Sequence, residues 1–128
     1  MTKYLLDTHV VLWVAENSPK LSEKAKKAIL DKNAEKYVSI VSAWEVAIKL
    51  GTKKLQLNGG LQEFYRMIDE NGFFTISVER DYLLKLLALQ DYHKDPFDRL
   101  IMATALFENM TLITVDENIH KYDMTELW

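Results

Sequence analysis

The chain contains no cysteine, and it has only two prolines and four glycines among its 128 residues. Without cysteine the protein can form no disulfide, no thiolate metal site and no cysteine nucleophile. The scarcity of proline and glycine leaves no stretch with the composition of a linker, and we find no internal repeat or low-complexity tract. We therefore expect residues 1–128 to form a single domain, long enough to bury a hydrophobic core.

Long apolar runs and an excess of positive charge are also missing. The apolar run from Val10 to Ala15 is too short to cross a bilayer, and Asp7 and His9 interrupt the hydrophobic core that a signal peptide would need. The formal net charge of −3 gives no general attraction to phosphate backbones or anionic lipids. We expect a cytoplasmic protein without a membrane partner, whose contact with nucleic acid would require a local basic patch or a metal ion.

Short apolar segments alternate with segments of helical periodicity. The expected strands are 4–6, 37–41, 73–76 and 111–115, with a weaker edge strand at 124–128. The expected helices are 10–14, 21–29, 42–51, 61–68, 83–89 and 96–107. Because the strands are apolar on both faces and alternate with helices, the pattern predicts an α/β fold, with helices on both faces of a short parallel sheet.

Two segments carry the residues that typically open a helix. Asp95 is a preferred N-cap, Pro96 suits the first helical position, and Asp98 then lies in the first turn, near free backbone N–H groups. Ser42 and Glu45 have the spacing of a capping box, with Ser42 as N-cap and Glu45 as its return arm. Helix capping alone is therefore one explanation for the acids at both places.

Four acids nevertheless occupy equivalent places in the predicted fold: Asp7 and Asp116 follow strands, and Glu45 and Asp98 lie in first helical turns. Ligands of open parallel sheets bind at the carboxyl ends of the strands. Asp98 reaches that edge only if its helix runs antiparallel to the next strand, which a short turn at 108–110 would enforce. Carboxylates gathered there would repel one another without a cation. Mg²⁺ or Mn²⁺, which prefer oxygen ligands, are the expected cofactors.

Hydroxyl and carboxyl groups beside these acids form a second tier of candidates. The hydroxyls of Thr8 and Thr114 could hold a carboxylate or a metal-bound water, or could satisfy strand ends. Asp95 is interpreted mainly as the N-cap, with a role behind the metal ligands as the alternative.

Basic side chains near the acids are candidates for substrate contact. Arg99 could hold a substrate phosphate or balance the site charge, and Lys49, four residues after Glu45, could do the same or simply pair with that acid. His93 is a candidate for substrate contact at the mouth of the site. His9 is expected to pack on its own helix.

Large apolar side chains outside the strands are interpreted as core or as a dimer interface. They are Trp13, Trp44 and the leucines of segment 83–89. Stacking of the two tryptophans on nucleic-acid bases is a sharper but less favoured interpretation.

Three other functional classes use a similar sheet. A haloacid-dehalogenase-type phosphoryl-transfer enzyme would need a second Asp at position 9, where this chain has His9. A phospho-receiver domain would need an Asp after the third strand, where Ser77 and Val78 precede Glu79. A catalytically silent interaction domain would keep four repelling carboxylates without using them. These features count against each alternative.

Four blocks of sequence resemble the PIN-domain ribonucleases, and within them the VapC-type toxins of bacterial toxin–antitoxin modules. The blocks are 6–13, 42–49, 93–101 and 112–116, and they occur in the family's order and spacing. The resemblance implies a three-layer α/β/α sandwich, a homodimer and a cognate antitoxin that covers the site. It also implies Mg²⁺ or Mn²⁺ at Asp7, Glu45, Asp98 and Asp116. The match is weakest after Asp116, which could act through water.

From the acids and the resemblance together we expect a metal-dependent endoribonuclease. Water activated at the metal would attack the scissile phosphorus and leave a 5′-phosphate and a 3′-hydroxyl. The sequence does not specify the RNA substrate, the number of metal ions or the antitoxin.

Overall fold

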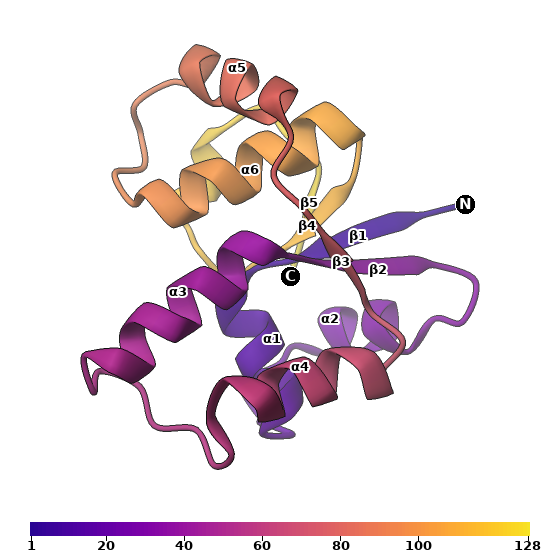
Figure 1. Ribbon diagram of the computed structural model, residues 1–128. Helices are drawn as coiled ribbons and strands as arrows, with labels where there is room; N and C mark the ends of the chain where they lie inside the picture. Colours follow the sequence, from indigo (N-terminus) through magenta and orange to yellow (C-terminus); the bar gives the residue numbers. More distant parts are fainter.

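The computed structural model describes residues 1–128 and contains a five-stranded parallel sheet between two layers of helices (Figure 1). The strands are β1 Lys3–Leu6, β2 Glu35–Ser39, β3 Phe74–Ile76, β4 Thr111–Ile113 and β5 Glu126–Leu127. The helices are α1 Thr8–Ala15, α2 Glu23–Leu30, α3 Ile40–Gly51, α4 Gly60–Glu70, α5 Arg80–Ala88, α6 Pro96–Glu108 and the 3-10 helix η1 Ile119–Lys121. The predicted α/β/α sandwich is confirmed.

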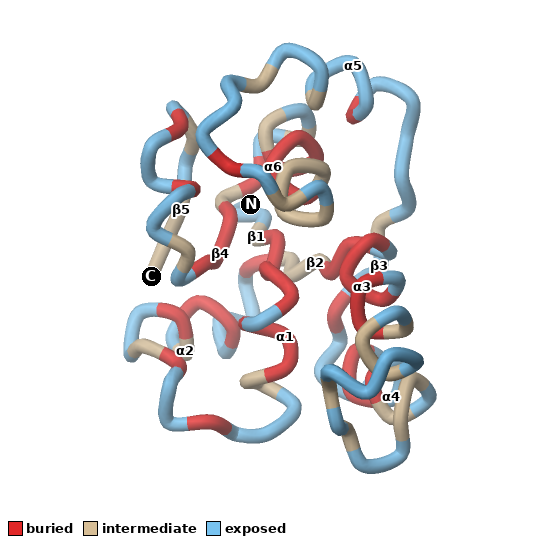
Figure 2. Tube along the Cα trace, turned by 90° about the vertical axis from the view of Figure 1, so that its left-hand side faces the viewer, coloured by how far each residue is buried: buried red, intermediate tan, exposed pale blue.

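Successive residues of the central strands point to opposite faces of the sheet, so each strand contributes to two cores. Leu6 and Ile113 pack with residues of α1, α2 and α4, whereas Leu5 and Leu112 pack with residues of α6. All four leucine and isoleucine side chains are fully buried. Figure 2 shows the carboxyl-terminal ends of β1 and β4 and the middle of α6 as buried. Burial on both faces explains the continuous apolar character of these strands.

The strand order is β3-β2-β1-β4-β5, which places β1 at the centre. The chain moves outward from β1 through β2 to β3, and then returns to the other side of β1 with β4 and β5. Leu6 is paired with Val38 of β2 and with Ile113 of β4. The strand order therefore reverses between β1 and β4. The carboxyl ends of these two strands form the crevice in which parallel sheets bind ligands.

The start of α3 differs from the prediction. β2 ends at Ser39, whose side-chain oxygen accepts a 3.0 Å hydrogen bond from the Val41 N–H, so Ser39 is the N-cap. The prediction of a capping box formed by Ser42 and Glu45 is therefore wrong, and Glu45 lies in the second turn of α3. The β-branched pair that follows Ser39 suits a strand as well as a helix, so propensity alone could not place this boundary. The fourth predicted strand also ends earlier, at Ile113.

The leucine-rich helix α5 lies on the outside of the molecule, against α6 (Figure 1). Leu84 and Leu87 are 68% and 85% exposed, so the interpretation of these leucines as core is wrong. Trp44 of α3 is also exposed, and its ring meets the edge of the Phe97 ring with centroids 4.9 Å apart. No helix has both the length and the apolar character that a membrane span requires.

Candidate metal site at the carboxyl edge of the sheet

Asp7 lies where β1 ends and α1 begins, at the reversal point of the strand order. One carboxylate oxygen accepts the Thr8 N–H at 2.7 Å, and the other accepts the Thr114 hydroxyl at 2.7 Å. Burial raises the pKa of Asp7, while the hydrogen bonds from Thr114 and Thr8 oppose that rise. Thr114 thus orients Asp7 from the end of β4. The Thr8 hydroxyl instead meets the Ser42 hydroxyl at 2.8 Å, which ties α1 to α3.

Glu45 projects from α3 and is only 4% exposed. Its Oε2 accepts a 2.7 Å hydrogen bond from Lys49 Nζ, one helical turn further on. This hydrogen bond raises the pKa of Lys49. The second oxygen, Oε1, is buried without any hydrogen-bond partner. A buried carboxylate oxygen without a donor is costly, so the site offers a position for a positive group beside Glu45.

Asp98 lies in the first turn of α6, and the predicted helix start is confirmed around it. Asp95 is the N-cap: its Oδ1 accepts the N–H groups of Phe97 at 2.8 Å and Asp98 at 3.1 Å, and Pro96 is the first helical residue. Burial raises the pKa of Asp98 to about 8, and the neighbouring carboxylate of Asp7 is the next largest cause. The carboxyl group of Asp98 therefore lacks a compensating cation.

Asp116 follows β4 and meets Asp98 through a histidine. His93 Nε2 lies 2.6 Å from Asp116 Oδ2 and 3.2 Å from Asp98 Oδ2. Ligand atoms of these three residues all lie within 4.8 Å of one another. Asp116 Oδ1 also accepts the Asn118 N–H at 2.9 Å. His93 is only 8% exposed, so it lies inside the cluster rather than at the mouth, where we expected it to contact substrate.

The short turn between α6 and β4 brings Asp98 to the same edge as the other acids. Asn109 adopts a left-handed conformation with φ of 56°, and the Met110 N–H bonds the Ala105 carbonyl at 2.9 Å. The helix therefore reverses directly into β4. Besides Asp7, the carboxylates of Glu45 and Asp116 also raise the pKa of Asp98. The other three predicted acids thus lie close enough to act on the charge of Asp98, while the closest group of possible ligands is His93, Asp98 and Asp116.

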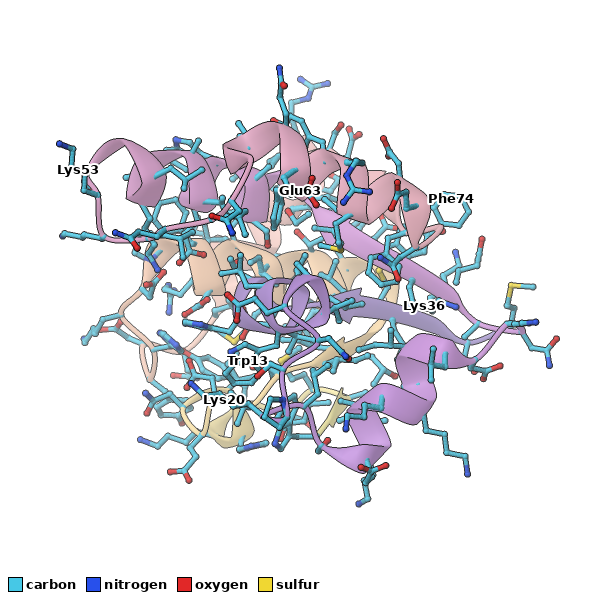
Figure 3. The ribbon with its side chains drawn as sticks, turned by 90° about the horizontal axis from the view of Figure 1, so that it is seen from below. Trp13, Lys20, Lys36, Lys53, Glu63 and Phe74 are labelled. Carbon is cyan, nitrogen blue, oxygen red and sulfur yellow. The ribbon has the colours of Figure 1, made fainter.

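The basic candidates take different places. The guanidinium of Arg99 donates to the carbonyls of Gln90 at 2.9 Å and His93 at 3.2 Å, so it binds the loop before α6 rather than facing the acids. Lys49 bonds one of the acids, Glu45. Lys53 and Lys54 are exposed in the turn after α3, and Figure 3 shows Lys53 extending away from the body of the protein.

The contacts of two residues in this region were not predicted from the sequence. The Tyr122 hydroxyl accepts the N–H groups of Tyr92 at 3.0 Å and His93 at 2.8 Å, and it donates to the Gln90 carbonyl at 2.8 Å. Ser42 bonds Thr8 rather than capping α3. Both contacts join residues about 30 or more positions apart. No local pattern in the sequence indicates them.

The donor set fits a hard divalent cation. Burial and the carboxylates of three other segments raise the pKa of Asp98 to about 8, and one oxygen of Glu45 has no hydrogen-bond donor. Mg²⁺ and Mn²⁺ take such oxygen ligands and retain waters in their remaining positions. Asp7, Glu45 and Asp98 would hold the ion. Asp116, which contacts His93, would lie next to them.

The chain was compared with known proteins. The family model for the PIN domain matches residues 4–124. "Ribonuclease VapC22" of Mycobacterium tuberculosis is 29% identical over 123 residues, which cover 95% of this chain and 93% of that protein.

Two solved structures share the fold at lower identity. VapBC2 from Rickettsia felis, bound to a promoter DNA fragment, matches with a TM-score of 0.77 and 18% identity, over 99% of both chains. Mycobacterium tuberculosis VapC20, a sarcin–ricin loop cleaving toxin, matches with a TM-score of 0.63 and 15% identity, over 97% of this chain and 98% of that one. With the family model covering nearly the whole chain, the protein belongs to the PIN domain family.

Proposed function

We propose that the protein is a metal-dependent endoribonuclease that acts as the toxin of a toxin–antitoxin pair. The observation that carries this proposal is the convergence of Asp7, Glu45, Asp98 and Asp116 at the reversal point of the sheet, where Glu45 Oε1 has no partner. The similarity to a protein named ribonuclease VapC22 and to a sarcin–ricin loop cleaving toxin supports RNA as the substrate class.

The residues of the site would divide the work. Asp7, held by Thr8 and Thr114, and Glu45 are already fixed, so they cost little to orient when a cation binds. Asp98 gives up its proton as its carboxylate becomes a ligand. When bound, Mg²⁺ or Mn²⁺ supplies the charge that activates a water for in-line attack on phosphorus. The expected products carry a 5′-phosphate and a 3′-hydroxyl.

The partners follow from the same comparison. The solved relatives include VapBC toxin–antitoxin complexes from several bacteria, so we propose a cognate antitoxin for this chain as well. We also propose a cytoplasmic homodimer, for which the exposed leucines of α5 offer an apolar surface. A catalytically silent interaction domain is the alternative, and it would leave the buried Glu45 oxygen without a purpose.

The test is RNA cleavage by the purified full chain with Mg²⁺, Mn²⁺ or EDTA. Asp7→Asn keeps the shape of the side chain but removes its charge, and it should lower the metal-dependent rate roughly 100-fold or more. Asp69→Asn changes an exposed acid of α4 and is the matched control, with an unchanged rate. Undiminished cleavage by Asp7→Asn, or equal cleavage in EDTA, contradicts the proposal.

A further inference from the structure

The two ring nitrogens of His93 have different partners, and these partners determine where its proton lies. Nδ1 is 3.1 Å from the backbone nitrogen of Asp95, whose N–H can only donate. Nδ1 is therefore the acceptor and carries no proton. The proton of the neutral ring then belongs to Nε2, which faces Asp116 Oδ2 at 2.6 Å and Asp98 Oδ2 at 3.2 Å.

A histidine in this tautomer cannot bind a metal ion through Nε2, since that nitrogen offers a proton rather than a lone pair. To become a ligand, His93 would have to move its proton to Nδ1 and lose the bond from the Asp95 N–H. That bond lies at the helix cap itself, because Asp95 also caps α6. The local structure therefore favours a donor at Nε2.

We propose that His93 is a positioning residue: its Nε2–H holds Asp116 beside Asp98 so that both carboxylates can face one divalent cation, and His93 itself is not a ligand. This inference rests on the proposed metal site. Groups behind metal ligands orient them in this way and tune their affinity. Without the donor, the two carboxylates would face each other with nothing to offset their repulsion.

The backbone around His93 is held independently of its ring. The Tyr122 hydroxyl accepts the His93 N–H at 2.8 Å, and Arg99 donates to the His93 carbonyl at 3.2 Å. Both also bind the Gln90 carbonyl, at 2.8 Å and 2.9 Å respectively. Because Tyr122 and Arg99 fix the loop, a substitution of the ring should alter the carboxylates more than the loop. Arg99 thereby acquires a structural role that the sequence did not indicate.

The first measurement needs no variant. Nitrogen NMR of the wild-type imidazoles distinguishes the Nε2–H tautomer from the Nδ1–H tautomer and from the doubly protonated ring. We expect the neutral His93 ring, assigned by its loss in His93→Ala and measured at a pH where the ring is neutral, to carry its proton on Nε2, both with and without Mg²⁺. A neutral ring protonated at Nδ1 overturns the proposal.

The second measurement is calorimetric titration of the full chain with Mn²⁺. His93→Ala should weaken the binding of Mn²⁺ roughly 10- to 100-fold. His93→Gln restores an N–H donor and should recover most of that loss, whereas a direct ligand would be lost in both variants. Equal affinities for His93→Ala and wild type, or no recovery by His93→Gln, overturn the proposal. If wild type itself binds no Mn²⁺, the proposed metal site fails instead, and the two failures are thus distinguished.

Discussion

Lys49 Nζ donates a 2.7 Å hydrogen bond to Glu45 Oε2, while the other oxygen of the same buried carboxylate has no partner. Lys49 therefore pairs with one oxygen of the Glu45 carboxylate. The other oxygen remains available, and we propose that it binds a metal ion. This relationship separates two kinds of positive charge at the site. One is covalently part of α3, and the other would have to be bound from solution.

Removal of Lys49 should make folding depend more strongly on divalent metal. In Lys49→Met, Glu45 is buried without any cation, so the variant should unfold several degrees below wild type in EDTA. Saturating Mg²⁺ should recover much of the loss, because the ion binds only the folded protein. Thermal unfolding followed by circular dichroism measures both effects. Lys54→Met, at an exposed position, is the control. Equal melting of Lys49→Met and wild type in EDTA would refute this reading of the ion pair.

Asp98 should make the protein less stable as the pH rises. Its pKa is raised to about 8 in the folded protein, above its unfolded value of about 3.9, so the folded state binds more protons between these limits. The free energy of unfolding in EDTA should therefore fall with pH across this window, by at most about 1.4 kcal/mol per unit for this one group.

Asp98→Asn should flatten that pH dependence and should melt no lower than wild type in EDTA at pH 7, since the uncharged Asn side chain needs no proton uptake on folding. Urea unfolding at several pH values measures the slope. A marked loss of stability in Asp98→Asn would instead indicate that Asp98 serves mainly to stabilise the start of α6.

Metal affinity should depend on pH in the opposite direction. Asp98 must lose its proton to become a ligand, so the apparent affinity for Mn²⁺ should rise up to about tenfold per pH unit and level off above about pH 8. Titrations in buffers of different ionisation enthalpy should show a proton released at pH 7. An affinity that is constant from pH 6 to about 8 would contradict the assignment of Asp98 as a ligand.

The exposed face of α5 should govern self-association. Leu87 is 85% exposed, so Leu87→Asp should leave the monomer folded but disrupt a dimer built on this face. Light scattering coupled to size exclusion measures the mass. Leu30→Asp changes another exposed leucine, which lies on α2 and is 76% exposed, and it should leave the oligomeric state unchanged. A dimer that persists in Leu87→Asp would place the interface elsewhere.

Much of the fold was accessible from the sequence because its signals are local. The strands are short apolar segments, and Asp95 with Pro96 marks the start of α6 without ambiguity. The prediction that the four acids lie near one edge rests on one general rule, that strand ends of a parallel sheet share an edge. Asp98 needed one extra condition, the tight turn at Asn109, which the structure satisfies.

The rest depended on contacts that no local pattern carries. Ser39 and Ser42 are both good N-caps, and only the tertiary contact of Ser42 with Thr8 separates their roles. His93 reaches Asp116 across 23 positions of sequence. In α5, leucines on several sides of the helix obscured which face would be exposed, because periodicity indicates a face only when one side is polar.

The central claim is that Asp7, Glu45, Asp98 and Asp116 share a divalent cation, and it can be tested by locating that ion. Crystals grown with Mn²⁺ and measured at the manganese absorption edge should show one or more anomalous peaks among these four carboxylates. A peak should lie next to Glu45 Oε1, the buried oxygen that has no donor. The absence of a peak next to Glu45 Oε1 at saturating Mn²⁺ would contradict the account. So would Mn²⁺ bound through the ring of His93 and away from Glu45.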